Sequence, residues 1–258
     1  MDFPEYHKIQ GVYKRDGKGN FIIGNYSLDV FRYLAHLPWR WTEKIDGTNV
    51  RIGIDPQVEQ PVLDEEMYLP IGDPIITIGG HHDNSQMPVL LTAAINCLLD
   101  CDRIQSTLQC PVVLYGEGYG GSIQKGHSHY GYPEQLGFIL YDVWVPESHN
   151  KLGGYWLDDA KVGEIAEGLD IPTVPMLPPM TLDFAINSIR YHPPISKIGV
   201  NLAEGIVGTP STPLFDRQGH RIITKIKYRD FLFLREQDST TAMSEDSNAF
   251  AFDFDWGW

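Results

Sequence analysis

The feature that most limits the fold of this chain is a succession of short strand-like segments separated by turns. In these segments apolar residues alternate with polar ones or β-branched residues cluster, at residues 21–23, 39–45, 49–54, 74–78, 112–115, 138–145, 205–208 and 221–228. Turn-forming residues are concentrated between them, for example at residues 16–20 and 216–219. Short strands joined by tight turns pair mainly with their neighbours, so the pattern predicts antiparallel sheets.

Three segments have the periodicity of helices instead. Between residues 88 and 108 apolar side chains recur three and four positions apart, which predicts one long helix. Residues 157–169 and 181–190 are predicted to form two more, the first of which opens with Asp158 and Asp159, where negative charge suits a helix N-terminus. Helices placed irregularly among short strands predict an α+β fold with antiparallel β-sheets and flanking helices, rather than a regular βαβ alternation.

The length of 258 residues suits one main domain with a short extension. We expect residues 1–235 to form that domain and residues 236–258 to form an acidic, aromatic tail, which contains six acids and no lysine or arginine. No apolar run approaches the roughly 18 residues of a membrane helix, and the first residues lack the pattern of a signal peptide. The sequence therefore predicts a cytoplasmic monomer that does not enter a membrane.

The net charge of −14 limits the kinds of partner that the chain can bind. Tight, non-specific binding of nucleic acid is driven by lysine and arginine, which displace counterions from phosphates. A chain this acidic can bind a polyanion only through a local basic groove, with help from a metal ion. Composition thus disfavours a general nucleic-acid-binding protein and is compatible with a specific phosphate site.

The cysteine and histidine residues do not predict a zinc site. Cys97, Cys101 and Cys110 lie in or beside the first predicted helix and lack the paired spacing of zinc ligands. Their odd number also makes a poor disulfide framework, so we expect reduced thiols.

Lys44 stands at the end of a strand-like segment and is followed by an acid and a glycine. Asp46 lies two residues on, and Gly47 lets the chain turn tightly. A lysine amine attacks an electrophile only when it is deprotonated, and nearby cations or a metal ion lower its pKa. Lys44 is thus a candidate nucleophile, although the segment alone fits a strand-to-turn junction with a solvated lysine equally well.

Three later segments supply the other parts of a phosphate site. Glu117 lies among glycines that admit a ligand closely, and Glu204 directly precedes another glycine. Lys225 and Lys227 stand two residues apart in a strand, so they point the same way and can clamp an α-phosphate. Glutamates can hold a ribose hydroxyl or a magnesium ion that shares phosphate oxygens. Each segment has an ordinary structural explanation, but the segments together favour nucleotide chemistry.

In this order the segments resemble the motifs of the covalent nucleotidyltransferase superfamily, which includes ligases and RNA capping enzymes. The matching positions, within about residues 39–231, are motif I at 44–47, motif III around Glu117, motif IIIa at 138–143, motif IV at 204–205 and motif V at 225–227. DNA ligases and capping enzymes usually carry arginine where this chain has Asn49, so the pattern is similar to the compact RNA ligases of phages and some microbes. The resemblance implies the nucleotidyltransferase (ATP-grasp-like) ligase fold.

The resemblance also implies an ATP-dependent RNA ligase with a three-step reaction. Lys44 would take AMP from ATP with release of pyrophosphate and pass it to an RNA 5′-phosphate, after which a 3′-hydroxyl would displace AMP. The implied cofactors are ATP, as AMP donor, and Mg²⁺ or Mn²⁺. The implied partners are RNA ends that carry a 5′-phosphate and a 3′-hydroxyl.

Roles for individual residues follow from the matching positions. The implied catalytic residues are Lys44, Glu204, Lys225 and Lys227. The implied nucleotide contacts are Asp46, Gly47, Asn49, Arg51, Glu117 at the ribose and Phe138 stacked on adenine. Asn49 and Glu204 would serve the metal, and His81 and Lys125 would contact substrate phosphate.

Two departures from the family pattern bear on activity. Family members carry an arginine where this chain has His81 and His82, and a neutral histidine cannot replace a bidentate guanidinium. Few residues follow Phe231, so we expect a catalytic domain nearly alone, without the oligonucleotide-binding barrel of DNA ligases and capping enzymes. Two alternatives therefore stay open: a nucleotidyltransferase that adenylylates itself but seals poorly, and a non-catalytic module that binds RNA ends or nucleotides.

Overall fold

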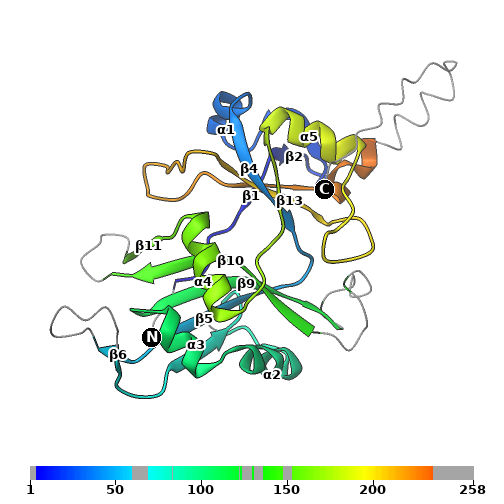
Figure 1. Cartoon of the computed structure of the whole chain (residues 1–258). Coiled ribbons are helices and arrows are strands. Elements are labelled where there is room, and N and C mark those ends of the chain that lie inside the picture. Colours follow the sequence, from blue (N-terminus) through cyan, green and yellow to red (C-terminus); the bar gives the residue numbers. More distant parts are fainter. Residues whose placement is uncertain are drawn as a thin grey trace, which may run out of the picture.

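The computed structural model describes residues 4–59, 69–82, 84–121, 123, 130, 136–147 and 153–234. Its main elements are two five-stranded sheets with helices packed on their outer sides (Figure 1). Strand β4 (Pro38–Lys44) of the first sheet runs through a short turn into β5 (Thr48–Asp55) of the second. The two sheets are therefore joined at the segment that carries Lys44.

The strands of the first sheet lie in the order β1 (Gln10–Gly11), β14 (Thr224–Lys227), β13 (Gly205–Pro210), β4 and β12 (Met176–Thr181). Neighbours pair antiparallel, except for β1 and β14, which are parallel. Trp39 and Trp41 of β4 are fully buried in a core shared with α5 (Leu182–Tyr191) and α1 (Asp29–Leu34). Alternate residues of β4 face the opposite way, toward the second sheet.

The strands of the second sheet are all antiparallel and lie in the order β11 (Gly154–Trp156), β10 (Leu136–Pro146), β9 (Val112–Gly120), β5 and β8 (Ile75–Gly79). One face is covered by three helices, α2 (Val89–Leu98), α3 (Cys101–Thr107) and α4 (Asp159–Leu169). Leu91, Ile95 and Ile104 of α2 and α3 are fully buried against Val50 and Ile52 of β5. This core holds the sheet in place behind the face that looks toward the first sheet.

A hairpin of β2 (Tyr13–Arg15) and β3 (Phe21–Tyr26) packs on a short 3₁₀ helix, η2 (Tyr228–Phe231). The rings of Phe21 and Phe231 have centroids 5.5 Å apart. η2 directly follows β14, the strand that carries Lys225 and Lys227. The hairpin therefore packs on the segment next to this lysine pair.

The structure confirms the predicted α+β class with antiparallel sheets and flanking helices. The single helix predicted over residues 88–108 is wrong: α2 ends at Leu98 and α3 begins at Cys101, because the Asp100 side chain accepts the Arg103 N–H and caps a second helix. The short helix α1 escapes prediction because six residues give too little periodicity. Two further short strands, β6 (Val58–Glu59) and β7 (Leu69–Pro70), pair with each other.

Two of the sequence predictions fall on residues that the structure does not describe, the tail at 236–258 and Lys125. Within the described ranges, no helix is long and apolar enough to cross a membrane.

Candidate active site

A cavity of about 310 Å³ lies between the facing sides of the two sheets. Arg40, Thr42 and Lys44 line it from every second position of β4, while Trp39 and Trp41 on the other side of the strand point into the core behind the sheet. Val207 and Thr209 of β13 continue the same wall. Burial of the two tryptophans thus fixes which side chains of β4 face the cavity, and Lys44 is one of them.

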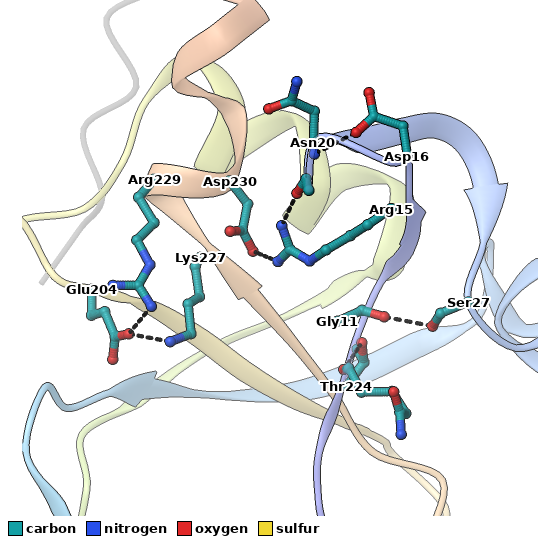
Figure 2. A network of polar contacts seen from close by, with 12 residues as sticks. Gly11, Arg15, Asp16, Asn20, Ser27, Glu204, Thr224, Lys227, Arg229 and Asp230 are labelled. Carbon is teal, nitrogen blue, oxygen red and sulfur yellow. Dashed lines mark hydrogen bonds and ion pairs between the residues drawn. The ribbon is translucent and has the colours of Figure 1, made fainter.

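Lys44, Glu204 and Lys227 form a hydrogen-bonded cluster beside the cavity. Lys44 Nζ donates to Glu204 Oε2 at 2.6 Å, and Lys227 Nζ donates to Glu204 Oε1 at 2.5 Å (Figure 2). Gly205 pairs with both lysines, which brings three neighbouring strands into register. A Cβ on Gly205 would lie 2.1 Å from Ile226 O, so only glycine fits between the two strands that carry the lysines.

The charges of this cluster and the burial around it shift several pKa values. Burial opposes the ionised form of Glu204, but Lys44 and Lys227 outweigh it and hold the pKa of Glu204 below its usual value. Burial, together with Lys227 and Lys44, lowers the pKa of Lys225. Burial raises the pKa of Glu117 to about 7, although Lys44 acts in the opposite direction. The site thus combines ionised Glu204, Glu117 with a pKa near neutrality, and several lysines. This combination of charges suits the binding of a phosphate.

The second sheet supplies the opposite wall from β5, β9 and β10. Asn49, Glu117 and Ile139 lie directly opposite one another on the three strands, so their side chains share a face. Asn49 and Glu117 line the cavity. Asn49 Nδ2 donates to the Tyr141 hydroxyl, and Asn49 Oδ1 is buried with no hydrogen-bond partner in the described part of the chain. A buried amide oxygen of this kind is available to a ligand or an ordered water.

The turn between β4 and β5, which contains the predicted Asp46 and Gly47, is held from two sides. The Asp46 N–H donates to the Tyr130 hydroxyl at 2.6 Å. A Cβ on Gly47 would lie 2.3 Å from Gly118 O and 2.8 Å from the Glu117 side chain, so the turn can pack against β9 only with glycine at this position. The turn therefore fixes the end of β4 relative to the opposite wall.

The aromatic side chain that faces the cavity from β10 is Tyr141 rather than Phe138. Phe138 is 1% exposed and lies in the helix-covered core, where its ring packs over Gly116. Tyr141 lines the cavity. The pairing with β9 shifts register between Leu140 and Asp142, and Asp142 lines the cavity as well.

The N-terminal segment and Arg221 form a part of the site that no motif in the sequence indicates. Arg221 donates to both oxygens of Asp142 at 2.7 Å, and the Tyr6 hydroxyl donates to Asp142 at 2.5 Å. All three line the cavity, as does His7, whose ring stacks on Tyr6. Burial and Arg221 lower the pKa of His7 to about 4. These residues are far apart in the chain, so only the tertiary structure brings them together.

The other predicted residues take different positions. Lys225 and His81 line the cavity. Burial and His82 lower the pKa of His81, so the neutral imidazole faces the cavity near pH 7. Arg51 is 1% exposed and its Nε donates to Gly80 O at 2.6 Å, which places the guanidinium in the interior rather than on the cavity wall.

A metal ion would find oxygen donors here but no complete set of protein ligands. In the parts of the chain that the structure describes, no group of three or more histidine, cysteine, aspartate or glutamate side chains could hold one. Magnesium, however, keeps several waters and binds one or two carboxylates together with substrate phosphates. The Glu204 carboxylate and Asn49 Oδ1 fit that mode, because they lie in the same site as the lysines suited to phosphate.

Comparisons with known proteins match most of this chain to one family. A family model described as RNA ligase matches residues 37–227. A mutant of Naegleria gruberi RNA ligase with ATP and Mn matches with a TM-score of 0.54 and 15% identity, over 90% of this chain and 60% of that chain. The Naegleria gruberi RNA ligase with PPi matches with a TM-score of 0.54 and 15% identity, over 81% of this chain and 55% of that chain.

The chain thus spans somewhat more than half the length of these solved structures. No sequence among the curated proteins compared matches it. At this identity the structural likeness establishes the fold, which is the predicted nucleotidyltransferase ligase fold.

Proposed function

The chain belongs to the RNA ligase family, and from this premise we propose that it is an ATP-dependent RNA ligase. In the proposed reaction Lys44 becomes bonded to AMP, AMP is passed to the 5′-phosphate of an RNA end, and a 3′-hydroxyl then displaces it. The observation that carries the proposal is the cluster in which Glu204 holds Lys44 and Lys227 beside a cavity large enough for a nucleoside.

Glu204 and the neighbouring lysines suit the first step. The Glu204 carboxylate holds the Lys44 amine in place, and Lys225 and Lys227 bring positive charge to the position that the α-phosphate would take. As Lys44 Nζ attacks the α-phosphorus, a P–N bond forms, the P–O bond to pyrophosphate breaks, and the amine loses a proton to solvent. Fixed cations stabilise the charge that spreads over the phosphoryl oxygens in the transition state.

The walls of the cavity suit a purine nucleoside. Tyr141 offers an aromatic face from the second sheet and Val207 lies on the wall of the first, and the planar base would lie between them. We assign adenine stacking to Tyr141 in place of Phe138. Glu117, in its ionised form, would accept a hydrogen bond from a ribose hydroxyl.

The proposal includes a divalent cation, Mg²⁺ or Mn²⁺, held through Glu204 and Asn49 Oδ1. The support is the presence of these oxygen donors and the Mn in the Naegleria gruberi structures. Such an ion would neutralise phosphate charge. The protein's own part is to fix the amine and the nucleoside on the two sides of the α-phosphate.

Incubation with ATP labelled on the α-phosphate tests the proposal. We expect a label that survives denaturation in the wild type and disappears in Lys44→Ala. Lys161→Ala is the matched control, because Lys161 is an exposed lysine on α4. Label that persists in Lys44→Ala would refute the role of Lys44. A wild type that takes up no label with either metal would instead favour the non-catalytic binding module.

Sealing is measured with 5′-phosphorylated RNA and compared with 5′-hydroxyl RNA, which cannot accept AMP in this way. Uptake of label without sealing would favour the self-adenylylating alternative.

We further propose that residues 1–235 are the catalytic unit, with residues 236–258 as a separate tail. We also propose that the protein acts as a monomer in the cytoplasm, which is the host's cytoplasm if the gene belongs to a phage. The support for the first point is that the assigned catalytic residues all lie between Lys44 and Lys227.

A further inference from the structure

Arg229 lies outside the cavity, on the solvent side of the Lys44, Glu204 and Lys227 cluster. It belongs to η2, two residues after Lys227, and its guanidinium is 3.9 Å from Glu204 Oε1 (Figure 2). The Arg229 side chain is 66% exposed, whereas that of Glu204 is 10% exposed. A separation of 3.9 Å is an ion pair without a hydrogen bond, so this contact leaves the guanidinium donors able to bind another anion.

The position of Arg229 indicates which substrate it can meet. The cavity between the sheets, which Arg229 does not line, would hold the nucleoside. A second substrate must therefore reach the phosphorus on Lys44 from the side that is open to solvent. Lys227 is 14% exposed and Arg229 66% exposed, so an incoming phosphate meets Arg229 before the buried cluster.

The backbone that carries Arg229 is anchored although its side chain is exposed. The next residue, Asp230, accepts a hydrogen bond from Arg15 at 2.8 Å, and its side chain is 10% exposed (Figure 2). Phe231 is fully buried against the hairpin. Because the Arg229 side chain is 66% exposed and makes no hydrogen bond in this 3.9 Å ion pair, the pair contributes little to stability. A fixed backbone with an exposed guanidinium is the arrangement expected of a residue that contacts a ligand.

We propose that Arg229 binds the 5′-phosphate of the RNA strand that receives AMP, an inference that rests on the proposed ligase function. The planar guanidinium can donate to two oxygens of a terminal phosphate, while a third oxygen attacks the phosphorus bonded to Lys44. A P–O–P bond forms, the P–N bond breaks, and Lys44 leaves as an amine that takes up a proton from solvent. Although the chain has a net charge of −14, it would thus recognise the terminal phosphate of an RNA through the lysine and arginine side chains gathered at this site.

The test separates the two steps of AMP transfer. Adenylylated protein, freed of ATP, is mixed with 5′-phosphorylated RNA, and transfer is followed in a single turnover beside a separate measurement of self-adenylylation. We expect Arg229→Ala to slow transfer to RNA at least tenfold more than it slows self-adenylylation. We expect Arg229→Lys to lie between this variant and the wild type, because lysine keeps the charge but lacks the fork of donors.

A binding assay supplies a second readout that a structural role would not move. The wild type should bind 5′-phosphorylated RNA more tightly than 5′-hydroxyl RNA, and Arg229→Ala should lose most of this preference. Arg103→Ala is the matched control, since Arg103 is 49% exposed and pairs at 3.4 Å with Asp170 on the helix-covered side of the second sheet.

Equal slowing of both steps in Arg229→Ala would overturn the proposal in favour of a general role at the site. An unchanged transfer rate, or an unchanged preference for the 5′-phosphate, would also overturn it. Failure of the proposed ligase function would look different, because the wild type itself would take up no AMP. In that case the binding preference still decides whether Arg229 recognises a terminal phosphate.

Discussion

Replacement of Tyr141 should weaken ATP binding, whereas replacement of Phe138 should weaken the fold. Tyr141 lines the cavity, and Phe138 is 1% exposed in the core behind β10. Stacking of a base on an aromatic ring is worth about 1–3 kcal/mol, so its loss should weaken affinity about 5- to 150-fold. Phe138→Leu leaves a smaller side chain in a closed core and should lower the free energy of unfolding by about 1–3 kcal/mol.

Titration with ATP and urea unfolding of the same samples measure the two effects together. Tyr141→Leu should lose affinity for ATP even where the protein is fully folded, together with some stability because the contacts of its ring with Tyr6 and of its hydroxyl with Asn49 are lost. Phe138→Leu should lose stability while the folded protein keeps its affinity. Tyr141→Phe keeps the ring and removes the hydroxyl that meets Asn49, so it separates stacking from the hydrogen bond. Weaker ATP binding in Phe138→Leu at unchanged stability, with normal binding in Tyr141→Leu, would refute the assignment of adenine to the cavity side of β10.

Three further changes test other parts of the site. Gly47→Ala should abolish adenylylation, because its Cβ would lie 2.3 Å from Gly118 O; AMP uptake measured beside a thermal melt shows whether the turn alone or the whole fold fails. Burial raises the pKa of Glu117 to about 7 from 4.5, so between these pH values the folded state keeps a proton that the unfolded chain has released, and stability should fall as pH rises. Urea titrations of Glu117→Gln across that range should lack this fall, and an equal fall would show that other groups cause it. Arg221→Met should lower the free energy of unfolding by about 3–5 kcal/mol, because it leaves Asp142 without its cation, and addition of Asp142→Asn should restore part of the loss in the same assay.

The grouping of Lys44, Glu204 and Lys227 could be predicted from the sequence because these residues mark the ends of neighbouring strands. Lys44 ends β4, Glu204 precedes β13, and Lys227 ends β14. In antiparallel pairing the ends of adjacent strands meet, and Glu204 does contact both lysines. The same alternation and turn signals gave the fold class, since both depend on local patterns. The roles of these residues stay predictions until the variants are measured.

The side chains of the opposite wall were harder to predict, because the side of a strand that faces a cavity depends on register. Phe138 and Tyr141 are both aromatic and three residues apart, so in a regular strand they face opposite ways. Only the pairing of Ile139 with Glu117 shows which face of β10 lines the cavity. No local sequence pattern predicts the register shift that follows Leu140. Tyr6 and Arg221 hydrogen-bond across 215 positions of sequence, a contact that no spacing rule encodes.

The arrangement of the two sheets explains why the candidate nucleophile lies where it does. The first sheet carries Lys225 and Lys227, and the second carries Asn49 and Glu117 on the opposite wall. The turn after Lys44 is a direct covalent link between the sheets, so a nucleophile at this point can reach the cations of one sheet and the nucleoside contacts of the other. Away from this turn side chains also link the two halves of the site, as where Arg221, three residues before β14 of the first sheet, donates to Asp142 of the second. A lysine placed two residues earlier in β4 would face the same cavity. Its backbone would lie about 6.8 Å further from Glu204, which is too far for a hydrogen bond to that carboxylate.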